Sequence, residues 1–259
     1  RVLMTNMKRP HDRTETAVVT GASGGIELET ARAIAADGWQ VVCLSRHACP
    51  LEGVRSIPCD ITDSAQVQAA FAAVDRVDLL VNNAGFGISG AVECTGEAEM
   101  RRQFDLNFFA WVTVIQAALP ALRESRGRIL NISSAAAVFS IPFQSFYSAT
   151  KAAVESLTCA LRSELAPFGI TVGALRLGDV KTGFTAARQK SGSGDDLCAG
   201  RIARSVAVME RDEQNGMPPA AIAAAVVRAA HKKRLPPVTT VGIKYKLRCG
   251  LNKLLPLSA

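Results

Sequence analysis

The sequence is poor in the residues that build metal centres and disulfide-bonded scaffolds. Its 259 residues include 3 His and 7 Cys, and the cysteines are scattered, with no CxxC motif and no cluster with histidine. An odd number of scattered cysteines in a chain of this length gives neither a disulfide framework nor metal-ligand spacing. We therefore expect no bound metal, a reducing environment and a cytoplasmic location.

Long apolar runs are also missing. The nearest approach is the stretch 108–122, which Thr113, Gln116 and Pro120 interrupt. Because a membrane-spanning helix needs about 20 predominantly apolar residues, we expect no such helix. Residues 1–15 are polar and lack the apolar centre of a signal peptide, so we expect them to form a disordered segment.

Excess positive charge is absent from most of the chain, although the formal net charge is +7. Seven bases and no acid lie in residues 231–259, which leaves 23 bases and 23 acids elsewhere. A neutral body argues against a nucleic-acid-binding face, so we expect no nucleic-acid partner. The basic tail, 244–259, carries leucines at helical spacing. Three interpretations of it stay open: it packs its leucines on the body, it closes the pocket or a subunit interface, or it lies on an anionic membrane surface.

What the sequence does contain is enough apolar material for one large folded domain, with 48% hydrophobic and 20% charged residues. Short β-branched runs alternate with segments of helical spacing, which predicts a parallel sheet with helices on both faces. The expected strands are 16–20, 40–45, 54–58, 78–82, 128–132, 171–175 and 238–241, and the expected helices run from the turn at 21–25 to about 37 and over 64–73, 97–122 and 146–167. We predict a single doubly wound α/β domain at 16–243, built on a mostly parallel seven-stranded sheet.

One long segment does not fit this alternation. Residues 178–216 are rich in Gly, Ser and charge, and they include a helix-like patch at 199–209. Long insertions of this kind in compact domains are commonly functional loops. Because the segment follows a strand at the carboxyl edge of the sheet, we predict that it forms a lid over a substrate cleft.

A glycine-rich turn, TGASGGI at 20–26, lies between the first strand and the first helix. A dinucleotide-binding fold holds the pyrophosphate at this junction, on free backbone N–H groups of the helix. The next residue is Glu27, where a third glycine is expected. Either this acid points to solvent, favoured by the helix dipole, or it crowds the turn, repels the pyrophosphate and weakens cofactor binding.

The end of the second expected strand indicates which cofactor is preferred. Arg46 lies about 20 residues beyond the turn, and no acid occurs between Val41 and Leu51. An acid at this place accepts the ribose 2′-hydroxyl of NAD, whereas an arginine suits the 2′-phosphate of NADP. The sequence therefore favours NADP(H) over NAD(H).

A possible catalytic pair lies on one long helix. Tyr147 and Lys151 are four residues apart, so their side chains share a helix face. A nearby ammonium favours the phenolate and should lower the Tyr147 pKa from about 10, which suits a general acid or base. Ser134 lies thirteen residues upstream of the tyrosine, at the end of a strand, where its hydroxyl could bind a carbonyl oxygen.

Taken in order, these motifs resemble the short-chain dehydrogenase/reductase family over residues 16–182. The resemblance implies a Rossmann fold and a nicotinamide cofactor. Its cofactor turn is similar to 20–26, its adenine-contacting pair to Asp60 and Ile61, its NNAG element to 82–85, its fourth catalytic residue to Asn107, and its serine and YxxxK motifs to 131–134 and 147–151. Two positions depart from the pattern: Glu27 replaces a glycine, and Leu177 stands where a proline usually precedes Gly178.

The resemblance implies a role for each matched residue. Tyr147 would donate the proton to the carbonyl oxygen, and Lys151 would lower the pKa of Tyr147 and bind the nicotinamide ribose. Ser134 would polarise the carbonyl, with Ser133 capping the strand end instead, and Asn107 would hold a water that links Lys151 to solvent. The residues expected to bind cofactor are Gly21, Ser23, Gly24, Gly25, Ile26, Arg46, Asp60, Ile61, Asn83, Ala84, Gly85, Tyr147, Lys151, Val180 and Thr182.

The predicted function is an NADP(H)-dependent oxidoreductase that interconverts a ketone or aldehyde and an alcohol. The alternative is a cofactor-binding protein of the same fold with little or no turnover because of Glu27. The substrate is expected to be bulky and apolar, although the residues proposed to line its pocket could equally well belong to the core; they are Phe139, Ile141, Phe143, Phe184, Leu197, Ile202, Val206 and Met209. The tail resembles that of the 17β-hydroxysteroid dehydrogenase branch, and the helices at 100–122 and 146–167 resemble those that form a homodimer or homotetramer in the family.

Overall fold

Seven strands form the main sheet, in the order β3-β2-β1-β4-β6-β7-β9, and every strand pair in it is parallel. The computed structural model describes residues 14–22, 24–184, 188–190 and 193–252. The strands are β1 (Thr16–Thr20), β2 (Gln40–Ser45), β3 (Arg55–Pro58), β4 (Leu79–Asn82), β6 (Arg128–Ser134), β7 (Thr171–Leu177) and β9 (Val238–Thr240). All seven expected strands are present, and β6 and β7 each extend two residues beyond the predicted end.

The strand order reverses between β1 and β4. The chain builds outward from β1 through β2 to β3, and then returns to add β4, β6, β7 and β9 on the other side. In a doubly wound sheet, the loops that follow the two central strands diverge at this place and leave a crevice at the carboxyl edge. The topology therefore places the ligand site beyond the ends of β1 and β4.

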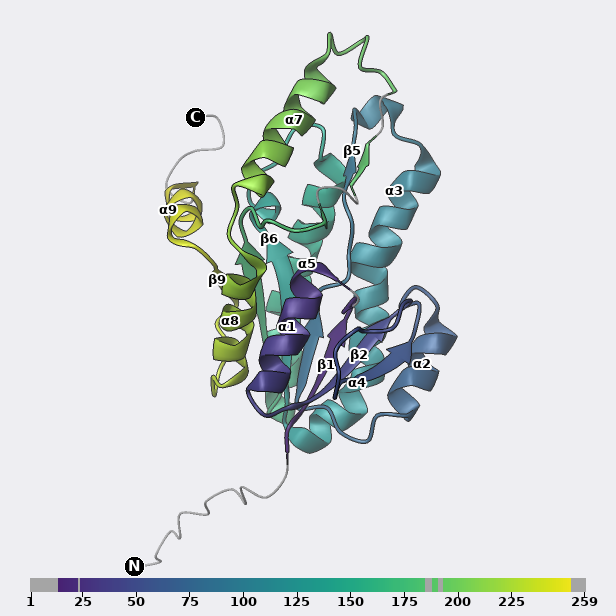
Figure 1. Cartoon of the computed structure of the whole chain (residues 1–259), viewed down its shortest axis with the longest axis vertical. Coiled ribbons are helices and arrows are strands. Elements are labelled where there is room, and N and C mark those ends of the chain that lie inside the picture. Colours follow the sequence, from purple (N-terminus) through teal and green to yellow (C-terminus); the bar gives the residue numbers. More distant parts are fainter. Residues whose placement is uncertain (1–13, 23, 185–187, 191–192, 253–259) are drawn as a thin grey trace, which may run out of the picture.

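Helices cover both faces of the sheet (Figure 1). The α-helices are α1 (Gly25–Ala36), α2 (Ser64–Ala72), α3 (Glu97–Phe104), α4 (Ala110–Ser125), α5 (Ser145–Leu165), α7 (Arg201–Gln214), α8 (Pro219–Ala230) and α9 (Ile243–Asn252). Helices α1 and α8 pack together on one face. Helices α2, α4 and α5 cover the other face and contribute Val67, Trp111 and Val154 to its core.

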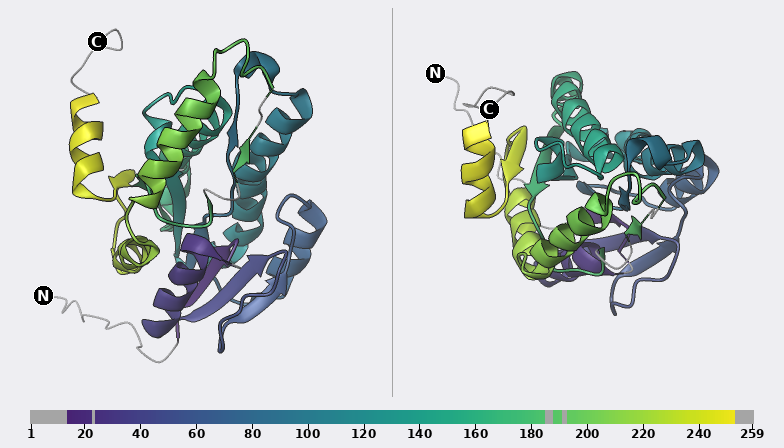
Figure 2. Two further views of the ribbon diagram at one scale, coloured as in Figure 1. Left: turned by 45° about the horizontal axis from the view of Figure 1, so that its top comes forward. Right: turned by 90° about the horizontal axis from the view of Figure 1, so that it is seen from above.

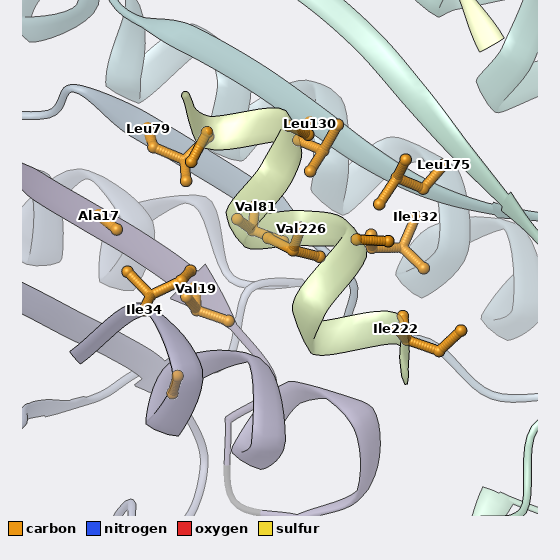
Figure 3. Close-up of a cluster of buried hydrophobic side chains, with 14 of the residues drawn as sticks. Ala17, Val19, Ile34, Leu79, Val81, Leu130, Ile132, Leu175, Ile222 and Val226 are labelled. Atoms are coloured by element: carbon orange, nitrogen blue, oxygen red, sulfur yellow. The ribbon is translucent and has the colours of Figure 1, made fainter. Parts of the chain in front are cut away.

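The core under α1 and α8 explains why the strands read as continuous apolar runs. Ile34 of α1 and Val226 of α8 meet Val19, Val81 and Leu130 from three neighbouring strands (Figure 3). Since helices cover both faces of a parallel sheet, both sets of alternating side chains have to be apolar. Helix α8 was not predicted from the sequence: its string PAAIAAAVVRAA has a single charged residue and therefore shows little amphipathic contrast.

The helix predicted at 97–122 is present and slightly longer. It consists of α3, a π-helical turn at Asp105–Phe109 and α4, and Pro120 lies within α4 without ending it. By length and mean hydropathy alone, residues 97–125 pass as a possible membrane span, which is weak evidence because core helices pass as well. Its inner side packs on the sheet through Trp111 and Val114.

The segment predicted as a lid carries structure of its own. A parallel pair joins β5 (Ile88–Ser89) to β8 (Gln189–Lys190), and α7 extends beyond the carboxyl edge of the main sheet (Figure 2). Helix α9, in the predicted tail, lies beside β9 at the edge of the molecule. Residues 1–13 of the expected disordered segment, together with Leu254 and Leu255 of the tail, lie outside the described residues.

Candidate active site

A cavity of about 840 Å³ opens at the carboxyl edge of the sheet, where the topology predicts it. Its walls come from the glycine-rich turn, the end of β6, α5, the loop after β7, α7 and α9. Of the predicted cofactor and catalytic residues, those that line it are Gly21, Gly24, Gly25, Ile26, Asn83, Gly85, Ser134, Tyr147, Lys151, Val180 and Thr182. One open cavity thus joins the turn to the proposed catalytic residues.

The glycine-rich turn is held closely against the loop that follows β4. The Thr20 hydroxyl accepts hydrogen bonds from the backbone N–H groups of Asn83 and Ala84, at 3.1 and 3.3 Å. Gly21 has a φ of +85°, and a Cβ there would lie 3.1 Å from Ala84, so this position requires glycine. No side chain caps α1 at Gly24. Free N–H groups at a glycine-lined helix N-terminus fit the phosphates of a dinucleotide.

Glu27 is the residue that disturbs this fit. Its side chain folds back over the turn. A Cβ built on Gly21 would lie 3.3 Å from the Glu27 Cγ, and a Cβ built on Gly25 would lie 3.0 Å from the Glu27 Oε2. The carboxylate also hydrogen-bonds the Asn83 side chain and lines the cavity. The interpretation that this acid points to solvent is therefore wrong. Burial raises the Glu27 pKa from 4.5 to about 7, against the lowering effects of its own backbone N–H, Lys151 and Asn83.

The Tyr147 hydroxyl lies against Ser134 and is hydrogen-bonded to it. The expected lowering of the Tyr147 pKa is wrong for this structure: the pKa is raised to about 12 because burial disfavours the phenolate. The Ser134 hydrogen bond and the Arg188 guanidinium oppose this rise, whereas Glu213 and Glu27 add to it. The hydroxyl therefore keeps its proton at neutral pH and can act as a donor.

Lys151 lies one helical turn beyond Tyr147 and is buried. Its ammonium donates a hydrogen bond to the Ile132 carbonyl at 2.9 Å and stands 4.6 Å from the centroid of the Trp111 ring. Desolvation lowers the Lys151 pKa to about 8, although Glu27 and Glu155 partly oppose this. The Ile132 carbonyl and the Trp111 ring thus hold the ammonium of Lys151 at the cavity wall.

The two serines at the end of β6 have different partners from those predicted. Ser134, and not Ser133, is the capping residue: its Oγ accepts from the Ala136 N–H at 3.2 Å, at the start of the 3₁₀ turn η3 (Ala135–Ala137). The Ser133 hydroxyl donates to Glu155 at 2.8 Å. Glu155 in turn forms a two-point ion pair with Arg176 of β7. Ser133 therefore belongs to the contact between α5 and the sheet.

Asn107 lies in the π-helical turn and is fully buried. Its Nδ2 donates to the Phe86 carbonyl at 2.9 Å and to the Thr150 hydroxyl at 3.3 Å, and its Oδ1 accepts from the Phe86 N–H at 3.1 Å. Both amide protons are thus used on protein partners. The side chain fixes the loop after Gly85 against α5, and π-helical turns of this kind are frequent at functional sites.

Four predicted cofactor residues lie outside the walls of this cavity. They are Arg46, the adenine pair Asp60 and Ile61, and Ala84 of the NNAG element, while Ser23 of the turn falls outside the described residues. Arg46 is exposed just after β2, two residues beyond Leu44, whose carbonyl accepts the Gly21 N–H at 2.8 Å. Asp60 accepts hydrogen bonds from Thr62, at the same edge of the sheet. Arg46 thus follows the strand end that is hydrogen-bonded to the glycine-rich turn.

Only some of the apolar residues predicted for the substrate pocket line the cavity. Phe139, Ile141, Phe184 and Met209 do so, and the Phe184 ring lies 5.7 Å from that of Tyr147. The remaining predicted residues do not: Phe143, Ile202 and Val206 pack in a separate small cluster, and Leu197 is 77% exposed. The pocket interpretation is therefore correct for the four residues that line the cavity, and the core interpretation is correct for the three in the cluster.

Several lining residues were not identified from the sequence. They are Gln144, Asp179, Ser205, Val208, Asp212, Glu213, Tyr245 and Arg248. Tyr245 reaches the cavity because α9 docks its ring on the backbone of Gly178 and its hydroxyl on Asp179. This contact joins positions 66 residues apart, and no local pattern indicates it. The acids of α7 could have been found only as the polar face of the predicted lid helix.

Comparisons with known proteins agree with this geometry. A family model described as short chain dehydrogenase matches residues 15–192. The chain is 40% identical to a 3-ketodihydrosphingosine reductase of Bacteroides thetaiotaomicron over 234 residues, 87% of each chain. It is 34% identical to the human 17-beta-hydroxysteroid dehydrogenase type 1 over 187 residues, 64% of this chain and 57% of the relative.

Solved structures give the same result for the fold. A short-chain dehydrogenase from Streptomyces avermitilis superposes with a TM-score of 0.83 at 32% identity and 94% coverage of both chains. A 3-ketoacyl-(acyl-carrier-protein) reductase from Brucella melitensis, complexed with NADH, gives 0.73 at 26% identity, with 88% of this chain and 96% of that chain covered.

Proposed function

Because the chain belongs to the short chain dehydrogenase family and is therefore an oxidoreductase, we propose that it reduces a ketone or aldehyde to an alcohol, reversibly, with NADP(H) as its cofactor. One observation carries this proposal. The Tyr147 and Ser134 hydroxyls meet at the wall of a cavity that also contains Lys151 and the glycine-rich turn. Two adjacent hydroxyls are what a carbonyl oxygen needs for polarisation and protonation.

When bound, a nicotinamide cofactor would supply the hydride for the carbonyl carbon. Ser134 binds and polarises the carbonyl oxygen, and Tyr147 donates its proton to that oxygen as it becomes an alcohol. The raised pKa of Tyr147, about 12, keeps the hydroxyl protonated before the reaction. Lys151 positions the tyrosine and the nicotinamide ribose, and Asn107 fixes the turn behind them. In the reverse direction, Tyr147 accepts the proton.

The preference for NADP(H) rests on Arg46. Its guanidinium is exposed at the end of β2, beside the turn, where it can pair with a 2′-phosphate. The bound cofactors named for similar structures do not decide the matter, since one similar protein was solved with NADH. We expect that replacing Arg46 with Ala weakens NADPH binding about tenfold or more and leaves NADH binding unchanged.

The substrate is proposed to be a ketone carried on a long apolar chain. Phe139, Ile141, Phe184, Val208 and Met209 are apolar residues that line the same cavity as Tyr147, and the Phe184 ring lies next to the Tyr147 ring. Residues 178–216 supply three of these side chains, which supports their proposed role as a lid. The relative named 3-ketodihydrosphingosine reductase is 40% identical to this chain over 234 residues. This relative makes 3-ketodihydrosphingosine the first substrate to test.

The test is calorimetric titration with NADPH and NADH, followed by assays of NADPH oxidation with 3-ketodihydrosphingosine, a steroid ketone and a small aromatic ketone. The expected result is tighter binding of NADPH and turnover that is fastest with the long-chain ketone. Preference for NADH would contradict the role of Arg46. Turnover confined to the small ketone would contradict the proposed substrate class.

A second function is favoured by a specific observation. The Glu27 carboxylate lies within the cavity, over the turn that should hold the pyrophosphate. If this acid prevents productive binding, the protein binds cofactor weakly and turns over little. Binding that is weak in the natural protein and restored in Glu27→Gly, with activity restored as well, would favour this alternative over an active reductase.

We further propose that the protein is a homodimer or homotetramer that associates through the outer faces of α4 and α5. Phe109 is 56% exposed at the start of α4, and Phe168 is 47% exposed beyond the end of α5, next to Arg123 near the other end of α4. These two rings, one near each end of α4, would form part of the proposed interaction surface.

A further inference from the structure

Glu27 faces the reaction site as well as the turn. It is the third residue of α1, and its carboxylate reaches over Gly21 and Gly25 toward Asn83 and Lys151. It also accepts a hydrogen bond from its own backbone N–H. That N–H belongs to the group of free donors that a helix N-terminus offers to an anion. The carboxylate of this chain therefore occupies an anion position in its own dinucleotide site.

The charges around this carboxylate come from several elements. Helix α5 contributes Lys151 and Tyr147. The Lys151 ammonium attracts the Glu27 carboxylate, and that carboxylate disfavours the phenolate form of Tyr147. Helix α8, packed against α1, has only the exposed Arg228 as a charged residue, and β1 and β2 have none. The remaining charged groups that line the cavity belong to the loop after β7, α7 and α9; they are Asp179, Asp212, Glu213 and Arg248.

An ionised carboxylate at this place opposes cofactor binding in two ways. It uses an N–H group and the attraction of Lys151, both of which a phosphate would otherwise receive. It also repels the cofactor's phosphates in a cavity where low polarity strengthens charge interactions. Protonation removes both effects, because a neutral acid neither repels a phosphate nor competes for the ammonium, and its O–H can donate a hydrogen bond to a phosphate oxygen.

We propose that Glu27 is a proton-linked residue of the dinucleotide site, such that cofactor binds to the form with a neutral Glu27 and takes up one proton from solvent on that side chain. This inference rests on the proposed function, since it concerns the same cofactor. The balance is simple: the carboxylate plus a proton plus cofactor gives the complex with a neutral acid. No electron transfer or other reactant is involved. The Glu27 pKa of about 7 places the effect at physiological pH.

The experiment is titration calorimetry of the apo protein with NADPH at pH 6, 7 and 8, in buffers of different ionisation enthalpy. The dependence of the binding heat on the buffer measures proton uptake. For the natural protein, we expect uptake of about half a proton at pH 7 and a Kd that rises toward tenfold per pH unit above pH 7. Lys151, with a pKa of about 8 that the Glu27 carboxylate raises, adds a loss of affinity above pH 8 in the natural protein.

Two variants isolate Glu27. Glu27→Gln should bind NADPH more tightly at pH 8 than the natural protein does, with a Kd that changes little between pH 6 and 7.5 and an uptake near zero at pH 7. Glu29→Gln is the matched control: it removes the same charge from α1, but Glu29 pairs with Arg32 outside the cavity walls. We expect it to behave like the natural protein. The cofactor's own phosphate titrates in the same way with the natural protein and with both variants, so it does not affect the comparison.

Each outcome separates this inference from the function on which it rests. If Glu27→Gln keeps the full pH dependence and proton uptake, or if the natural protein shows neither, the inference is overturned while the dinucleotide site stands. If neither the natural protein nor Glu27→Gly binds NADPH or NADH at any pH, the proposed function is overturned as well. Glu27→Gly also replaces Glu27→Gln if the amide variant fails to fold.

Discussion

At the scale of single residues, the site depends on how burial sets protonation. Tyr147, Lys151 and Glu27 share one cavity, and for each of them desolvation is the largest cause of the pKa shift. It favours the neutral form of every group, which raises the pKa of the two acids and lowers that of the lysine. Tyr147 therefore keeps a proton that it can donate, and Glu27 can lose its negative charge by taking one up.

The first prediction concerns Tyr147. Replacing it with Phe removes the proton donor and keeps the ring that packs against Phe184. We expect the turnover rate with the best ketone to fall about 10²–10⁴-fold, the range of general acid catalysis, and the affinity for NADPH to change little. Steady-state kinetics and calorimetry measure the two quantities. A variant that kept more than about a tenth of the rate would show that Tyr147 is not the donor.

The second prediction concerns stability and pH at Glu27. The folded-state pKa is about 7 and the unfolded value is 4.5, so the fold favours the protonated acid. The stability from this group is fully present below pH 4.5 and is lost as pH rises through 7. We expect Glu27→Gln to stabilise the apo protein at pH 8 by about 1–3 kcal/mol, and to have much less effect at pH 5. Urea unfolding at both pH values measures this difference. An equal effect at pH 5 and pH 8 would contradict it.

At the scale of elements, the cavity is completed by pieces that lie far apart in the sequence. Helix α9 docks through Tyr245, whose ring covers the backbone of Gly178 and whose hydroxyl bonds Asp179. Cys249 of the same helix is buried against β7, beside Arg176. Of the three interpretations of the tail, the described part of α9 supports the one in which it closes the pocket, because Tyr245 and Arg248 line the cavity. The interpretation that its leucines pack on the body is wrong for the two described ones, since α9 packs through Tyr245 and Cys249 instead. Ile243, Leu247 and Leu251 remain exposed.

The third prediction follows from this docking. A Cβ at Gly178 would lie 2.0 Å from two ring carbons of Tyr245, so Gly178→Ala should displace the ring and loosen α9. An overpacked contact typically costs 1–3 kcal/mol, and we expect tryptic cleavage at Lys244, Lys246 and Arg248 to become about tenfold faster or more. Mass spectrometry of timed digests measures this rate.

The matched control for this substitution is Gly250→Ala, on α9 itself. A Cβ there would meet nothing within 4 Å, so cleavage should stay at the natural rate. If both alanine variants are cut equally fast, the contact between Tyr245 and Gly178 does not hold the helix.

At the scale of the whole molecule, the proposed association through α4 and α5 gives the fourth prediction. Phe109→Glu places a charge on the exposed apolar surface at the start of α4, and we expect it to shift the protein toward monomer in sedimentation velocity. Gln68→Glu adds the same charge on the exposed side of α2, away from that surface, and should leave the mass unchanged. A natural protein that sediments as a monomer would contradict the proposal.

The sequence predicted most of the sheet, because strands buried between two helical layers are marked by local apolar runs. It also placed Tyr147, Lys151 and Ser134 correctly, since helix spacing and strand ends are local features. It could not predict α8, whose composition lacks polar contrast, nor the approach of Tyr245, which depends on packing between distant elements. For Glu27 the sequence left two orientations open, and only the folded turn, which brings Asn83 and Lys151 toward it, decides between them.

The position of Trp111 has an optical consequence. Its ring lies under the ammonium of Lys151, and its indole N–H donates to the Ala84 carbonyl at 2.8 Å, in the loop beside the turn. The other tryptophan, Trp39, lies beside His231 in the core on the other face of the sheet. A Trp39→Phe protein would therefore carry a single tryptophan, whose emission we expect to respond to the charge of Lys151. The molecule contains its own reporter for the electrical state of the site, without any attached dye.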